Sequence, residues 1–339
     1  MAVLPERFAG AGFEFRDTFW ERTFMRYLPY AAASSEPNVI VDGTANDRTL
    51  ITLSHWRRSG TPADLMADTS TAIVFNYLDR PDLHVAADVV SNNHFDEDGL
   101  VGIYALLEPE AAASRRDLLI DAAQAGDFGV FRSRRAARIA FAISAHADPS
   151  RSPFPRPLFD RPAPQVEEGL YRALLDVLPR LLVDIDGYRS LWRPEDAALT
   201  NTEQLFDAGR ITIEEQPELD LAVVRGPSAG EWHPMAVHTR TAATRLLLVH
   251  GARVEFRYRY ESWVQMASRR PALRVDLSAL AGELTREDRS DGRWRFEGVE
   301  HITPRMYREG GASVLTAEDI RRRLEAALRA GAPAWNPYG

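Results

Sequence analysis

The sequence predicts an α/β fold, with a parallel sheet in the N-terminal part and an α+β domain in the C-terminal part. From about residue 36, short β-branched runs alternate with longer stretches of helical periodicity, which is typical of a parallel sheet with crossover helices. After about residue 210, strand patterns dominate. Between these parts, residues 149–164 contain six prolines, a density that excludes a helix or a central strand. We therefore expect an α/β domain at 1–148, a proline-rich linker with connecting helices at 149–209, and an α+β domain at 210–339.

The expected N-terminal elements follow one another as strand, strand, helix, strand and helix. Thr61-Pro62 resembles a helix start, because a capping residue precedes a proline in the first turn. The predicted strands are 38–42, 49–54 and 84–90, and the predicted helices are 61–78, 100–107, 117–125 and 134–145.

The C-terminal half begins with helices and continues with strands. His250-Gly251 indicates a tight hairpin turn between two strands. Thr316 as a cap, Asp319 at the third position and Gly331 as a stop predict a final helix. The predicted helices are 166–183, 194–208 and 316–330, and the predicted strands are 210–215, 219–224, 245–249, 253–260 and 293–296.

Composition excludes several classes of function. The 339 residues include 41 basic and 49 acidic side chains, a net charge of −8, so a general binder of duplex nucleic acid is not expected. No apolar run approaches the roughly 18 to 20 residues of a membrane span, and 1–10 has no signal-peptide pattern, so we expect a cytoplasmic protein without a membrane partner. There is no cysteine and no lysine. Any metal must therefore be held by His, Asp, Glu or carbonyl oxygen.

A cluster of acidic and histidine residues lies where a predicted strand ends and a helix begins. His94, Asp96 and Asp98 fall within five residues, and Gly99 follows them. Ligands in open α/β sheets bind at the carboxyl ends of strands. The mixture of imidazole and carboxylate suits a divalent metal, whose charge offsets the repulsion between the acids. The alternative is a solvated acidic turn, but the strand, turn and helix setting favours a metal site.

Four segments resemble the motifs of the DHH phosphoesterase superfamily. His94-Phe95-Asp96-Glu97-Asp98-Gly99 is similar to its first motif, and Val39-Ile40-Val41-Asp42-Gly43 to its second. Ser54-His55-Trp56 corresponds to the Asp-His-His triplet of the third motif, and the stretch ending at Asp127 to the fourth. The order along the chain is second, third, first, fourth, so the resemblance implies a permuted arrangement of the same sheet.

The resemblance implies hydrolysis of a phosphoester or phosphoanhydride in a small, nucleotide-like substrate. In the family, two divalent ions, Mn²⁺ or Mg²⁺, lie about 3.5 to 4 Å apart and activate a bridging water. Asp42 would be the bridging ligand, and Asp42, His94 and Asp98 would be the catalytic residues. The implied metal ligands are Asp42, His55, His94, Asp96, Asp98 and Asp127.

Two departures from the family pattern keep a second class of function open. Ser54 stands where the family has an Asp that orients the ligand His, and Trp56 stands where it has a His that faces the substrate. The loss of an outer-shell carboxylate commonly weakens metal affinity or activity. A non-catalytic descendant that binds a nucleotide or a metal is therefore the alternative.

The C-terminal part offers weaker candidates. Residues 254–260 and 273–281 loosely resemble the accessory substrate domain of DHH enzymes, without its Gly-Gly-His loop, and Arg257 and Arg259 are candidates for phosphate binding. A third possibility is a serine hydrolase. Ser228 lies in a Gly-x-Ser-x-Gly pattern, with Asp276 and His301 downstream in the order of a hydrolase triad. Pro227 constrains that turn, and 231–234 is not expected to open the helix that such an elbow requires.

Overall fold

The N-terminal part of the chain forms a parallel sheet of four strands. The computed structural model describes residues 25–228, 230–289, 291–310 and 313–339. The strand order is β1-β4-β2-β3, and all neighbouring strands are parallel. The predicted strands at 38–42 and 49–54 are confirmed, whereas the third is shorter than 84–90. The strands are β1 (Arg26–Tyr27), β2 (Asn38–Val41), β3 (Thr49–Leu53) and β4 (Val89–Ser91).

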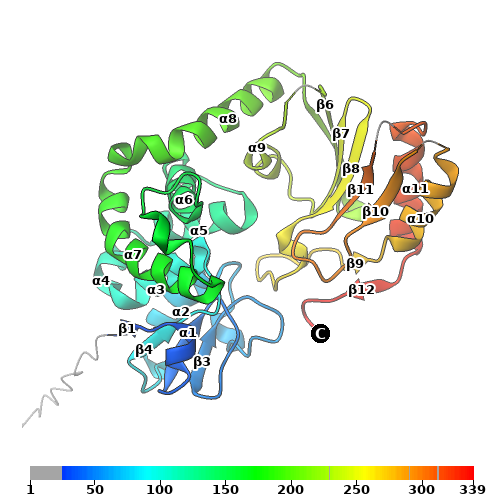
Figure 1. The fold of residues 1–339 in the computed structure, drawn as a ribbon. Helices are drawn as coiled ribbons and strands as arrows, with labels where there is room; N and C mark the ends of the chain where they lie inside the picture. The colour runs from blue at the N-terminus through cyan, green and yellow to red at the C-terminus, as the bar shows by residue number, and fades with distance from the viewer. Residues whose placement is uncertain (1–24, 229, 290, 311–312) are drawn as a thin grey trace, which may run out of the picture.

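Helices surround this sheet and, together with it, build the largest of the four hydrophobic clusters among the described residues. α2 and α3 lie side by side against the sheet, and α5 and α6 pack behind α3 (Figure 1). The expected helix start at Thr61 is wrong: the Thr61 hydroxyl donates to the carbonyls of residues 52 and 54, and Thr69 caps the helix instead. The helices are α1 (Tyr30–Ala33), α2 (Ser70–Leu78), α3 (Glu97–Leu107), α4 (Pro109–Ala113), α5 (Arg116–Phe128), α6 (Arg134–Ala147) and α7 (Ala163–Val183).

The proline-rich stretch 149–164 contains one 3-10 turn and then the beginning of α7. The next helix, α8 (Arg189–Asp207), begins before the predicted start at 194 and contains Pro194. It arches from the N-terminal lobe, which holds β1 to α7, to the C-terminal lobe, which holds β5 to β12 (Figure 1).

The C-terminal lobe contains a mixed sheet of six strands in the order β10-β11-β8-β7-β6-β5. The predicted hairpin is confirmed, since β7 and β8 pair up to His250 and Arg253, and Gly251 has a positive φ of 59°. The strands are β5 (Thr212–Gln216), β6 (Leu221–Gly226), β7 (Arg245–His250), β8 (Arg253–Tyr258), β10 (Arg293–Phe296) and β11 (Arg305–Glu309). A separate pair is formed by β9 (Arg274–Val275) and β12 (Pro333–Trp335).

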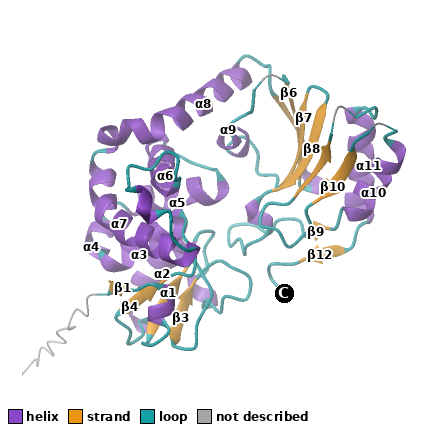
Figure 2. Cartoon of the chain, viewed as in Figure 1, coloured by secondary structure: helices purple, strands orange, loops and turns teal. Residues whose placement is uncertain are grey.

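Helices cover both faces of this second sheet. α10 (Ser278–Glu287) and α11 (Ala317–Ala330) cover the outer face, and the short α9 (Pro234–His238) lies on the face toward the N-terminal lobe (Figure 2). The predicted cap of α11 is confirmed, because the Thr316 side chain accepts a hydrogen bond from the N–H of Asp319.

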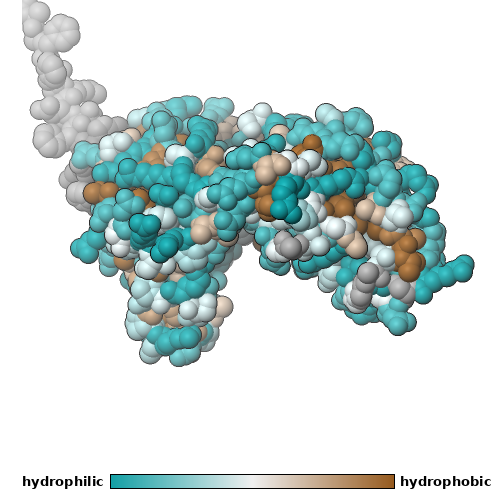
Figure 3. Space-filling model, turned by 90° about the horizontal axis from the view of Figure 1, so that it is seen from above, coloured by the Kyte–Doolittle hydropathy of each residue, from teal (hydrophilic) through white to brown (hydrophobic). Residues whose placement is uncertain are grey.

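The two lobes meet through a loop of the C-terminal lobe, residues 260–268. The N–H of Gln265 donates to the carbonyl of His55 (2.8 Å), and the carboxylate of Asp68 accepts the N–H groups of Ala267 and Ser268 (2.8 Å each). A cavity of about 400 Å³ lies beside these contacts and is lined from both lobes. Seen from above, the surface is mostly hydrophilic, with scattered apolar patches (Figure 3). Within the described ranges, no helix is long and apolar enough to cross a membrane.

Candidate metal centre

Three neighbouring parallel strands deliver polar side chains to one edge of the N-terminal sheet. Asp42 follows β2 directly, His55 comes shortly after β3, and His94 shortly after β4. Asp42 has a positive φ of 48°, which is uncommon for a residue with a side chain. A Cβ on the adjacent Gly43 would lie 2.3 Å from the Asn93 side-chain oxygen, so glycine allows the two loops to approach closely.

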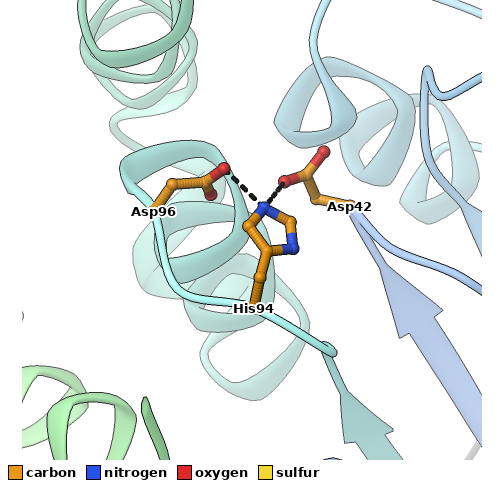
Figure 4. Close-up of side chains that lie close together, drawn as sticks. All are labelled: Asp42, His94 and Asp96. Carbon is orange, nitrogen blue, oxygen red and sulfur yellow. Dashed lines mark hydrogen bonds and ion pairs between the residues drawn. The ribbon is translucent and has the colours of Figure 1, made fainter. Parts of the chain in front are cut away.

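His94 lies between two carboxylates (Figure 4). Its Nε2 is 2.7 Å from Asp96 Oδ2 and 3.3 Å from Asp42 Oδ2. The other oxygen of Asp96 accepts the N–H of Gly99 (2.8 Å), so Asp96 also caps α3. The beginning of α3 therefore holds Asp96 in place, and the end of β2 holds Asp42.

His55 faces the opposite oxygen of Asp42 and is completely buried. Its Nε2 is 3.4 Å from Asp42 Oδ1 and 3.6 Å from Asp127 Oδ2, which α5 contributes. Its Nδ1–H donates to the carbonyl of Asp68 (2.6 Å). This bond fixes the ring orientation and leaves Nε2 for a ligand, a role that outer-shell carbonyls commonly have at metal sites. The carbonyl of Asp68 thus orients the imidazole.

Asp98 connects the centre to the beginning of α2. Its two carboxylate oxygens accept the N–H groups of Ser70 (2.6 Å) and Thr71 (2.7 Å), and the side chain is buried. Asp98, His55 and Asp42 form one group that could hold a metal, and Asp42, His94 and Asp96 form another. Asp42 belongs to both groups.

The close carboxylates strongly perturb one another. Burial, and then the charges of Asp98 and Asp96, raise the pKa of Asp127 well above its ordinary value. Burial disfavours the charged form of His94, but the carboxylates of Asp96 and Asp42 outweigh it and raise the pKa of His94 to about 11. A bound cation would offset this concentration of negative charge.

The donor set fits divalent cations. Asp42 Oδ2 and Asp127 Oδ2 are buried and accept no hydrogen bond from any residue that the structure describes, an arrangement that is rare without a bound partner. The distances of 3.4 and 3.6 Å around His55 Nε2 are too long for hydrogen bonds. Neighbouring ligands that an octahedral Mg²⁺ or Mn²⁺ holds at about 2.1 Å lie roughly 3.0 Å apart, so a small inward movement of the two carboxylates would bring them to coordination distance. A buried Asp/His cluster of this kind can accommodate a metal.

Residues outside the expected ligand set also reach the centre. Tyr260, from the C-terminal lobe, places its hydroxyl 3.4 Å from His55 Nε2. Tyr171 of α7 donates to the carbonyl of His94 (3.0 Å), and the ring of Trp56 packs against His94 at a tilt, with centroids 4.9 Å apart. Burial raises the pKa of Glu97 to about 7. The only sequence signal for Tyr260 was its position at the end of the predicted arginine-bearing strand 253–260.

The two arginines proposed for phosphate binding have different surroundings. Arg259 is 2% exposed, pairs with Glu261 (2.5 Å) and donates to the carbonyl of Thr241 (2.9 Å). Arg257 pairs with Glu255 (2.7 Å) and lines a cavity of about 680 Å³ on the sheet face toward α9. Arg257 is therefore the more accessible of the two.

The nucleophile-elbow pattern does not assemble a triad in the described structure. Ser228 lines the 680 Å³ cavity, but among the described residues it has no hydrogen bond to Asp276 or His301. Asp276 instead accepts the N–H of Ser278 at the beginning of α10. One expectation is wrong, because a helix does follow this segment: His233 caps the five-residue α9.

The model of one protein family matches residues 23–339, nearly the whole chain; its description is a family of unknown function, DUF6687. The chain belongs to this family. No curated protein and no solved structure matches it. Membership of DUF6687 therefore supplies no activity, and functional inference depends on the buried Asp/His cluster.

Proposed function

We propose that this DUF6687 chain is a metal-dependent phosphoesterase with two divalent ions, Mn²⁺ or Mg²⁺. The observation that carries the proposal is the sharing of Asp42 between two groups of potential metal ligands. Its Oδ1 faces His55 and its Oδ2 faces His94, as a carboxylate that bridges two ions would. The resemblance of the four motifs to the DHH superfamily supports the same arrangement.

Each ion would have its own set of ligands around the shared Asp42. His94 and Asp96 would hold one ion, and His55, Asp98 and Asp127 would hold the other. Two divalent ions supply Lewis-acid stabilisation of a phosphoryl group and lower the pKa of a water nucleophile. The protein's own contribution is orientation: the carbonyl of Asp68 fixes His55, and the N–H groups of α2 and α3 fix Asp98 and Asp96.

The proposed substrate is a small phosphorylated molecule of nucleotide-like size. The 400 Å³ cavity lined from both lobes lies within the range of about 300 to 1,000 Å³ that is usual for ligand pockets. Asp68, whose carbonyl orients His55, lines this cavity together with Phe128, the residue after Asp127. Arg257 is our candidate for a contact with an anionic group of the substrate, because a guanidinium pairs well with phosphate.

Turnover on a panel of phosphoesters and phosphoanhydrides tests this proposal. We expect activity to disappear with EDTA, to return with Mn²⁺ and to survive Ser228→Ala, because water is the proposed nucleophile. Asp96→Asn should lower the rate by about 100-fold or more, since it removes a ligand. Activity that resists EDTA and disappears in the Ser228→Ala variant would instead establish the serine hydrolase.

A binding protein without turnover is the second candidate, and the position of Trp56 favours it. Its indole packs against His94 at a tilt, where DHH enzymes have a His that faces the substrate. Trp56→His should raise turnover several-fold if the chain is a weakened enzyme, whereas unchanged zero turnover with intact Mn²⁺ binding would favour a binding role. Phosphoester turnover and calorimetric Mn²⁺ titration of both proteins measure the two outcomes.

A further inference from the structure

The C-terminal lobe places one hydroxyl directly at the candidate metal centre. Tyr260 begins a 3-10 turn, Tyr260–Ser262, shortly after β8, and its hydroxyl is 3.4 Å from His55 Nε2. Within the described part of the chain, no other side-chain or backbone group lies within hydrogen-bonding reach of this hydroxyl. The residue is far from the motifs in sequence and becomes part of the centre only through the packing of the lobes.

Aromatic contacts fix the position of this hydroxyl. The Tyr260 ring meets the His55 ring edge to face, with centroids 5.7 Å apart, and packs against Phe128 at 5.8 Å. It also stacks on Trp263 at 5.9 Å. A tyrosine enclosed on these sides has little freedom to turn its hydroxyl away from the centre.

The hydroxyl has no good partner in the protein itself. Its distance of 3.4 Å to His55 Nε2 is beyond the range of about 2.5 to 3.2 Å for a well-formed hydrogen bond. The other nitrogen of His55 is occupied by the carbonyl of Asp68. If Nε2 binds an ion, the Tyr260 O–H has no acceptor on the imidazole and is left to donate to whatever oxygen is bound beside that ion.

We propose that Tyr260 donates a hydrogen bond to a phosphoryl oxygen bound at the Asp/His centre, and so contributes to substrate binding from the opposite lobe. This inference rests on the proposed function and adds a substrate contact to it. The backbone bond from Gln265 to His55 holds the same loop in place. The packing of the two lobes therefore holds the donor at the centre.

The test compares two single-atom deletions in the same region. Tyr260→Phe removes the hydroxyl at the centre. Tyr338→Phe is the matched control, because the Tyr338 hydroxyl bonds the backbone of Met266, in the same loop. Calorimetry measures Mn²⁺ affinity for each protein, and then the affinity of the Mn²⁺-loaded protein for inorganic phosphate.

We expect Tyr260→Phe to keep Mn²⁺ affinity within about twofold and to weaken phosphate binding by about tenfold, the usual loss for a hydrogen bond to a charged oxygen. Tyr338→Phe should change neither value. Unchanged phosphate affinity in Tyr260→Phe overturns this inference and leaves the proposed function intact. Loss of Mn²⁺ binding in Tyr260→Phe also overturns it, since the phenol would then be a metal ligand. A wild-type chain that binds no Mn²⁺ overturns the proposed function and the inference together.

Discussion

At the scale of single residues, Asp127 shows the consequence of crowding carboxylates without a cation. Its pKa is raised well above the ordinary value by burial and then by Asp98 and Asp96. A raised pKa means that the native state holds the proton more tightly than the unfolded chain does. In the metal-free protein, stability from this group is therefore fully present below the unfolded pKa of about 4 and is lost as the pH rises toward the folded pKa.

The Asp127→Asn substitution should raise the stability of the metal-free protein and lower the stability of the metal-bound protein. In EDTA at pH 7 we expect the variant to be more stable than the wild type, because the neutral amide avoids the burial and the repulsion by Asp98 and Asp96 that raise the pKa of Asp127. With saturating Mn²⁺ the order should invert, because the wild type gains the energy of binding and the variant lacks a ligand. Thermal unfolding between pH 4 and 8 measures both. A variant that is less stable than the wild type even in EDTA would show that the cluster is not strained.

Local sequence patterns identified the strand ends but not all helix starts. The runs before Asp42, His55 and His94 are short and β-branched, and the structure places all three residues at one edge of a parallel sheet. The helix does not begin at Thr61, because the Thr61 hydroxyl bonds the carbonyls of residues 52 and 54. Thr69 caps α2 instead, by accepting the N–H of Ala72.

Long-range contacts explain what the sequence did not reveal about the site. The four motifs lie within the first 130 residues, where strand and helix order limits the possible neighbours. Tyr260 is separated from His55 by 205 positions, and no local pattern encodes their approach. The contact between the Asp68 carbonyl and His55 could not be predicted either, because every residue type has a backbone carbonyl.

At the scale of elements, two glycine-to-alanine substitutions should have opposite effects on the free energy of unfolding. A Cβ at Gly102 of α3 would lie 2.7 Å from Val41 Cγ1 of β2, so Gly102→Ala should cost about 1 to 3 kcal/mol through overpacking. Gly282 of α10 has space, with its nearest neighbour 3.6 Å away, and Gly282→Ala should stabilise by up to about 1 kcal/mol. Urea unfolding measures both. Equal effects would mean that α3 does not pack this tightly on β2.

At the scale of the whole molecule, the ligands around His55 are enclosed where the two lobes meet, whereas His94 and Asp96 are partly exposed. Asp42, His55 and Asp98 are all fully buried. The side chain of Asp68 accepts three hydrogen bonds from residues 267 and 268, while its carbonyl orients His55. Asp68 therefore contacts the opposite lobe with its side chain and orients His55 with its backbone.

Asp68→Ala should loosen the lobes without removing a metal ligand. The backbone carbonyl that holds His55 remains, so Mn²⁺ affinity should change by less than about threefold, whereas the three bonds to the opposite lobe are lost. We expect the radius of gyration from small-angle X-ray scattering to increase and phosphate affinity to fall, since Tyr260 would reach the centre less often. Asp64→Ala is the control, because Asp64 is an exposed aspartate that shortly precedes Asp68 in the sequence. If Asp68→Ala leaves both the radius and the phosphate affinity at the wild-type values, the lobes are held by their aromatic contacts, and Asp68 serves His55 alone.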